Sequence, residues 1–112
     1  QMVATTEDQD DLILENTTTL KVARWWNRAC DIIPCNGGKD IGIQKILDYF
    51  NFNKEEAMAF GDGGNDISML KYVGTGVAMG NAKDNVKAIA DYITDSVQED
   101  GIDSALKHFE IL

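Results

Sequence analysis

The hydrophobic residues follow two different periods, which predict short strands that alternate with helices. Apolar runs at 57–60 and 77–79 have a length typical of buried strands. Apolar residues spaced three and four positions apart predict amphipathic helices that start near positions 39, 66, 83 and 99. Strands and helices that alternate over such short distances form right-handed β-α-β units. The pattern therefore predicts an α/β fold with a parallel sheet and flanking helices.

The first third of the chain has a different pattern. Residues 1–18 are polar and acidic, which predicts a disordered or weakly held start in which only 12–14 is a strand candidate. Residues 20–33 are rich in Val, Ile and Trp, which predicts one or two strands with a turn near Asn27. A loop of turn-forming residues at 34–38 then leads into the first predicted helix.

Two of the predicted helices have ends that the sequence leaves open. In the helix that starts near Lys39, Asp40 is a plausible cap. The helix that starts near Lys83 carries Val86 and Ile89 on one face, but 92–94 would also suit the start of a further short strand. The only histidine, His108, is expected at the surface of the last helix.

Charge and composition exclude several classes of partner. The chain has 112 residues and a net charge of −9, which argues against nucleic acid and anionic membranes as partners. No apolar run approaches the ~18 residues of a membrane span, and the amino terminus lacks the basic and apolar regions of a signal peptide. With only Cys30 and Cys35, a reduced pair is expected rather than a zinc site. The expected location is therefore cytoplasmic.

The most informative stretch is the turn Gly61-Asp62-Gly63-Gly64-Asn65-Asp66, between a predicted strand and a predicted helix. Its glycines allow a tight turn. Its polar side chains, Asp62, Asn65 and Asp66, would lie at the carboxyl end of a strand, where open α/β sheets bind their ligands. Carboxylate and amide oxygens gathered on one loop suit a hard divalent cation, and Mg²⁺ is the predicted cofactor.

Other interpretations of this turn are weaker. An EF-hand loop starting at Asp62 would need Gly where Ile67 stands and Glu where Val73 stands. A dinucleotide fingerprint would need its last glycine at Asp66, and two carboxylates would repel a pyrophosphate. Asn65 or Asp66 acting only as a helix cap remains the structural alternative.

The turn also carries a family resemblance. The segment 61–70 resembles the fourth motif of the haloacid dehalogenase (HAD) superfamily, in its Cof-type sugar-phosphate phosphatase branch. The segments 76–82 and 100–102 resemble those that follow in these enzymes, and Lys39 resembles the lysine of the third motif. The family usually has Lys-Gly at that point, whereas Asp40 follows here. The resemblance covers about residues 20–112.

The resemblance implies roles for four residues. Asp62 would be a catalytic Mg²⁺ ligand, and Asp66 would be a more distant partner of the metal or would hold Lys39. Asn65 would donate its amide to the phosphate. Lys39 would stabilise the phosphoryl charge, although a lysine in this position, taken alone, is more often simply solvated.

The resemblance also implies an organisation in two parts. Residues 1–33 would be the end of a cap domain, in which Arg24, Trp25 and Trp26 are candidate substrate-side residues. Residues 34–112 would be the carboxyl-terminal half of a Rossmann-like HAD core. The expected substrate is a small phosphorylated metabolite.

The nucleophile expected for such an enzyme is missing from this sequence. The family transfers the phosphoryl group to the first aspartate of Asp-x-Asp-Gly-Thr and then to water, and the chain contains no such motif. Asp8 and Asp10 have the carboxylate spacing, but no apolar strand precedes them. The chain is therefore expected to be inactive alone. Its strand at 57–60 is expected to have an unpaired edge that takes up the missing half or a second copy. The alternative function is a non-catalytic α/β binding or interaction module derived from such a hydrolase.

Overall fold

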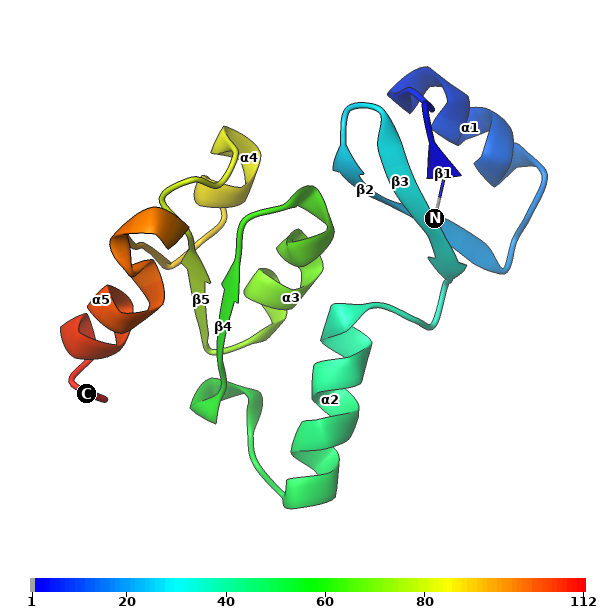
Figure 1. Ribbon diagram of the computed structural model, residues 1–112. Helices are drawn as coiled ribbons and strands as arrows, with labels where there is room; N and C mark the ends of the chain where they lie inside the picture. The colour runs from blue at the N-terminus through cyan, green and yellow to red at the C-terminus, as the bar shows by residue number, and fades with distance from the viewer. Residues whose placement is uncertain (1) are drawn as a thin grey trace.

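The computed structural model describes residues 2–112, which form two three-stranded sheets with helices around them (Figure 1). The first sheet is antiparallel in the order β1-β3-β2, with β1 at Met2–Val3, β2 at Leu20–Trp26 and β3 at Ala29–Pro34. The second is parallel in the order β4-β5-β6, with β4 at Met58–Gly61, β5 at Thr75–Ala78 and β6 at Tyr92–Ile93. The predicted α/β fold with a parallel sheet is confirmed.

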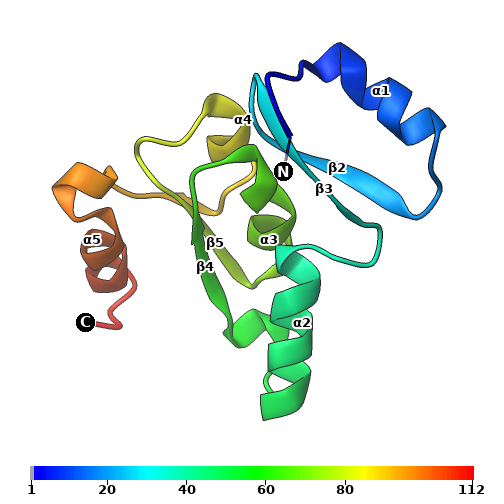
Figure 2. The same ribbon diagram turned by 45° about the vertical axis from the view of Figure 1, so that its right-hand side comes forward.

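The helices surround these sheets. They are α1 (Glu7–Glu15), α2 (Lys39–Phe50), α3 (Ile67–Tyr72), α4 (Asp84–Lys87) and α5 (Gly101–His108). Three short 3₁₀ turns complete the chain: η1 (Lys54–Glu56), η2 (Gly64–Asp66) and η3 (Val97–Glu99). In both ribbon views α1 lies beside the antiparallel sheet, whereas α2 and α3 lie on one side of the parallel sheet and α5 on the other (Figures 1 and 2).

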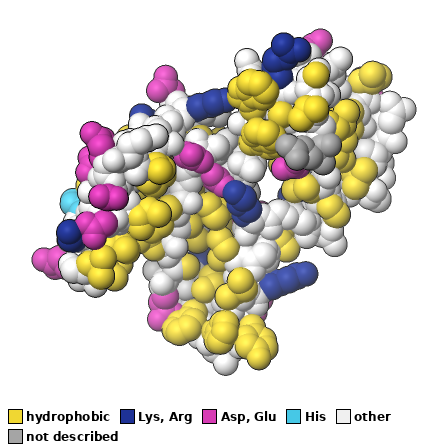
Figure 3. Space-filling view, viewed as in Figure 1, with side chains coloured by type: hydrophobic (Ala, Val, Ile, Leu, Met, Phe, Trp, Pro, Cys, Tyr) yellow, Lys and Arg dark blue, Asp and Glu magenta, His cyan; other side chains and the backbone are white. Residues whose placement is uncertain are grey.

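The core of the parallel part is made mostly of small and aliphatic residues. Leu70 of α3 and Val86 of α4 are almost completely buried beside Ala59 of β4 and Ala78 of β5. Their burial removes apolar surface from water and fixes α3 on the sheet. Hydrophobic side chains also gather on the surface at the carboxyl end of α2, where Tyr49 and Phe50 are exposed (Figure 3).

The prediction of a disordered start with a strand at 12–14 is wrong for residues 2–18, while Gln1 lies outside the described residues. The segment forms β1 and then α1, which includes 12–14. The backbone N–H of Thr6 donates to the Gln9 side chain at 3.0 Å and so stabilises the first turn of the helix. One of the acidic side chains that suggested disorder has a partner in the fold, because Asp10 forms an ion pair with Arg24.

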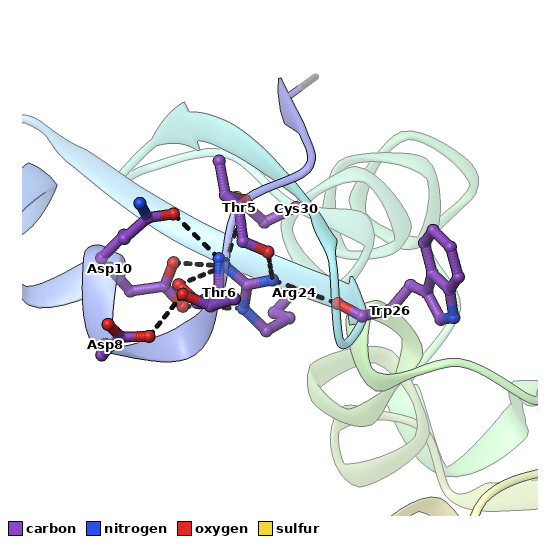
Figure 4. Close-up of polar contacts among 8 residues, drawn as sticks. Thr5, Thr6, Asp8, Asp10, Arg24, Trp26 and Cys30 are labelled. Atoms are coloured by element: carbon purple, nitrogen blue, oxygen red, sulfur yellow. Dashed lines mark hydrogen bonds and ion pairs between the residues drawn. The ribbon is translucent and has the colours of Figure 1, made fainter.

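Arg24 anchors α1 to the antiparallel sheet (Figure 4). Its guanidinium donates to both carboxylate oxygens of Asp10, at 2.9 and 2.5 Å, and to the backbone carbonyls of Thr5, Thr6 and Trp26. The hydrogen bond from Arg24 lowers the pKa of the Asp10 carboxyl below its ordinary value, although burial partly opposes this. The donors of Arg24 are thus bound within this cluster, and its substrate-side role stays a prediction.

Two details of the predicted helices also need correction. The helix near Lys83 ends at Lys87, and the alternative strand is the one that forms, because β6 pairs in parallel with β5. Asp40 does not cap α2, which begins at Lys39 after Gly38. The Asp40 carboxylate instead accepts a hydrogen bond of 3.3 Å from the Ser68 hydroxyl and so links α2 to α3. His108 is exposed as expected, and its ring stacks on Tyr92.

Strand β4 is an edge strand, as predicted. Among residues 2–112 it pairs with β5 alone, so its second edge has no strand partner within this part of the chain. That the missing half of the enzyme or a second copy of the chain pairs with this edge remains a prediction.

The two sheets meet where β2 packs against η2, and Gly64 makes this contact close. A Cβ atom on Gly64 would lie 2.5 Å from the backbone carbonyl oxygen of Arg24. We therefore expect Gly64→Ala to lower the free energy of unfolding by about 1–3 kcal/mol, because one of the two backbones must move. Urea denaturation followed by circular dichroism measures this.

Gly42→Ala is the matched control. Nothing lies within 4 Å of a Cβ at Gly42, which is inside α2. This substitution should raise the free energy of unfolding by about 0.5–1 kcal/mol through helix propensity. Equal stability of Gly64→Ala and the wild type would contradict the predicted clash.

Candidate functional site

The candidate site lies where the parallel strands β4 and β5 end. Asp62 follows β4 directly, and η2 then carries Asn65 and Asp66. A pocket of about 430 Å³ opens there, and all four predicted site residues line it. The pocket is lined by Trp25, Lys39, Asp62, Gly63, Asn65, Asp66, Asn81 and Lys83. Acidic and basic side chains come together on this side of the molecule, in the hollow between its two parts (Figure 3).

Asp66 is the most enclosed of these side chains. Only 5% of the residue is exposed. One carboxylate oxygen accepts the backbone N–H groups of Asp62 and Gly63 at 3.0 and 3.1 Å. The other accepts a hydrogen bond from the Lys39 ammonium group, with which it forms an ion pair. Asp66 therefore ties the turn after β4 to the start of α2.

The charge on Asp66 is stabilised by these partners. Burial alone would raise the pKa of its carboxyl, but the hydrogen bond from Lys39, the two backbone N–H groups and the lysine charge together lower it below the ordinary value. Asp66 is thus a carboxylate at neutral pH, although it is buried. Of the two roles considered for it, holding Lys39 is the one that its contacts match.

Lys39 reaches the site from the first residue of α2. The chain leaves β3 through the loop 35–38, and Gly38 has φ 130°, a backbone conformation that side chains strongly disfavour. The Lys39 side chain remains 49% exposed while its ammonium group contacts Asp66. It therefore presents a positive charge to the pocket from a fixed position.

Asp62 is the exposed carboxylate of the site. Its backbone N–H is bound by Asp66, whereas its side chain opens onto the pocket. One carboxylate oxygen accepts a hydrogen bond of 3.1 Å from the Asn81 amide. The two carboxylates of the turn thus differ in their surroundings. The Asp66 carboxylate is bound within the protein, and the Asp62 carboxylate is open to a ligand in the pocket.

The residues present fit Mg²⁺ in chemistry but supply only part of a site. Carboxylate oxygen is the ligand that Mg²⁺ prefers. Within residues 2–112, however, no group of three or more His, Cys, Asp or Glu side chains lies close enough to hold a metal. Because Asp66 already binds Lys39 and two N–H groups, Asp62 is the ligand that this chain would contribute.

Sequence reasoning missed two polar residues that line the pocket, Asn81 and Lys83. The available signal was their position after β5, because the carboxyl ends of neighbouring parallel strands meet at one edge of a sheet. Trp25 lines the pocket, and Trp26 lines an adjoining hollow of about 290 Å³ that Trp25 and Lys83 also line. The substrate-side roles of both tryptophans stay predictions.

Asp66 should make folding stability depend on pH. Its folded pKa lies below the ordinary aspartate value of 3.8, so its contribution is complete above that pH and is lost as pH falls through the folded pKa. We expect Asp66→Asn to lower the free energy of unfolding by about 2 kcal/mol at neutral pH and by much less at strongly acidic pH. Urea denaturation at both pH values measures the difference.

Asp103→Asn serves as the control for this experiment. Asp103 pairs with Lys107 on α5 with both side chains well exposed, so its loss should cost about 0.5 kcal/mol or less. An Asp66→Asn deficit that stayed constant over the whole acid range would contradict the assigned charge on Asp66.

The chain is similar to haloacid dehalogenase-like hydrolases in both sequence and structure. The family model for haloacid dehalogenase-like hydrolases matches residues 2–106. The HAD subclass IIB sugar phosphatase BT4131 superposes with a TM-score of 0.91 at 45% identity, over 97% of this chain and 42% of that one. The Bacillus subtilis 5-amino-6-(5-phospho-D-ribitylamino)uracil phosphatase YitU is 44% identical over 89 residues, which are 77% of this chain and 33% of that protein.

A third similarity is to the phosphatase BT1666 of Bacteroides thetaiotaomicron. It has a TM-score of 0.91 and 38% identity, over 97% of this chain and 41% of that one. The chain thus spans less than half the length of each of these three relatives. On the family match and these similarities, the chain belongs to the haloacid dehalogenase-like hydrolases.

Proposed function

We propose that this chain forms part of a Mg²⁺-dependent phosphatase that hydrolyses small phosphate esters through an aspartyl-phosphate. The observation that carries the proposal is the pairing of an exposed carboxylate, Asp62, with a lysine that Asp66 holds at the same pocket. A metal ligand and a fixed cation at one site suit phosphoryl transfer, in which catalysis rests on positioning and on stabilising negative charge. The relatives named above are phosphatases, which supports this reaction class.

The roles follow from the contacts of each residue. The Lys39 ammonium group would neutralise charge on a phosphoryl oxygen, and Asp66 would keep the lysine in place. Asn65 would donate its side-chain amide to another phosphoryl oxygen from η2. Asp62 would be one ligand of Mg²⁺, which when bound screens the charge of the phosphoryl group and orients it for in-line attack.

Among residues 2–112, the only carboxylates that line this pocket are Asp62 and Asp66, and both have other proposed roles. Asp10 is bound to Arg24 and Asp8 to Thr6, and neither carboxylate is among the residues that line the pocket. We propose that an Asp-x-Asp-Gly-Thr segment is supplied beside the free edge of β4, and that the 112 residues alone are inactive. A second copy of the chain could cover that edge but would bring no such motif.

The organisation into two parts belongs to the same proposal. Residues 1–33 would be the end of a cap, with Trp25 facing the pocket, and residues 34–112 would be the carboxyl-terminal half of the Rossmann-like core. No helix in residues 2–112 has the length and apolar character needed to cross a bilayer. The cytoplasmic location and the lack of nucleic-acid partners remain predictions.

The test joins this chain to an amino-terminal HAD segment that carries Asp-x-Asp-Gly-Thr, with p-nitrophenyl phosphate as substrate. We expect Mg²⁺-dependent hydrolysis. Asp62→Ala should lower kcat/KM by about 100-fold or more through loss of metal-assisted charge stabilisation. Lys39→Met should lower it by about the same factor, because a fixed donor to the developing charge is lost.

Asp103→Ala, at an exposed position on α5, is the control and should leave kcat/KM unchanged. Full activity of Asp62→Ala would overturn the metal role. A folded, joined protein with no activity at all would instead favour the non-catalytic module.

A further inference from the structure

We propose that Asn81 is a positioning residue that orients the Asp62 carboxylate toward the pocket. This inference rests on the proposed function, because it concerns the residue proposed to bind the metal. It assigns a task to a side chain that lies 19 positions from Asp62 in the sequence and on the neighbouring strand's loop.

Both ends of the Asn81 carboxamide have partners. Its Oδ1 accepts the backbone N–H of Val97 at 3.0 Å, and its Nδ2 donates to Asp62 Oδ2 at 3.1 Å. A backbone N–H can only donate and a carboxylate can only accept. The amide therefore fits in one orientation, with its oxygen toward Val97 and its nitrogen toward Asp62.

The backbone around Asn81 is also fixed. Met79 donates its N–H to the Gly61 carbonyl at 2.9 Å, and Gly80 donates its N–H to the Asp95 carbonyl at 3.0 Å. A Cβ on Gly80 would lie 2.7 Å from the backbone nitrogen of Ser96, so the loop packs tightly on the segment before η3. Asn81 is thus held between the turn after β4 and the start of η3.

Asp62 needs such a partner because only its backbone is otherwise held. Asp66 binds the Asp62 N–H, but the Asp62 side chain is exposed and would be free to change rotamer. A hydrogen bond to one carboxylate oxygen fixes the plane of the group and presents the other oxygen to an ion. A neutral amide does this without the repulsion that a lysine at the same place would exert on Mg²⁺. Removing a hydrogen-bond partner of a metal ligand typically weakens metal binding by about 10–100-fold.

The experiment measures Mn²⁺ binding to this chain joined to the amino-terminal HAD segment, as in the activity test, by paramagnetic broadening of the backbone amide signals of residues 61–66. Asn81→Ala should weaken the apparent Mn²⁺ affinity by about tenfold. Asp62→Ala should remove the site-specific broadening. In a chain that already carries Asp62→Ala, adding Asn81→Ala should change nothing further, because the two residues act through one contact.

Val97→Pro separates positioning from a merely structural role. Proline lacks the N–H that Asn81 accepts, and the first position of η3 tolerates it. This variant loses the Val97 bond, but the Asp62 carboxylate can still accept only from the amide nitrogen. The amide therefore keeps its orientation, and the Mn²⁺ affinity should stay within about twofold of the wild type. If Val97→Pro weakened Mn²⁺ as much as Asn81→Ala, the positioning role would be overturned, because holding η3 would explain both results.

The remaining outcomes are distinguishable. Loss of broadening in Asp62→Ala with wild-type affinity in Asn81→Ala overturns the role of Asn81 and leaves the proposed function standing. Unchanged broadening in Asp62→Ala overturns the metal role of Asp62, and with it both proposals.

Discussion

The geometry of the site depends on the buried carboxylate of Asp66. The turn after β4 leaves the backbone N–H groups of Asp62 and Gly63 without partners in either the sheet or the helix, and Asp66 binds both of them. The same carboxylate binds Lys39, which begins a helix 27 positions earlier in the chain. A buried charge is tolerated only when it is paired and hydrogen-bonded, and this one has both kinds of partner. Removing it would release the turn and the lysine together.

This arrangement divides the work between two aspartates that stand four positions apart. Asp66 is buried, and its carboxylate oxygens bind only groups of the protein itself, so its role is structural. Asp62 has its backbone fixed by Asp66 and its side chain exposed to the pocket, with Asn81 on one oxygen. Asp66 thereby holds Asp62 ready to bind an ion. A ligand on an unrestrained turn would lose conformational entropy each time that it bound one.

The antiparallel sheet contributes to the site through close contact rather than through charge. The Arg24 guanidinium is turned away to hold Asp10 and α1, while the Arg24 backbone carbonyl lies against Gly64 in η2. The next residue, Trp25, is thereby brought to the rim of the pocket. A single strand thus anchors the amino-terminal helix with one side chain and shapes the site with its backbone.

The sequence by itself determined the alternation of strands and helices and the turn at 61–66, because period and glycine spacing are local properties of the chain. The choice of Lys39 as a site residue came from the family resemblance alone. It misjudged α1, since the acidic residues that suggested disorder find a partner in Arg24, 14 positions away from Asp10. It also gave no sign that Asp40 would bind Ser68. Only the tertiary structure decided that Asp66 holds Lys39 and that Asn81 lies on Asp62, because both contacts join segments that the fold, and not the spacing, brings together.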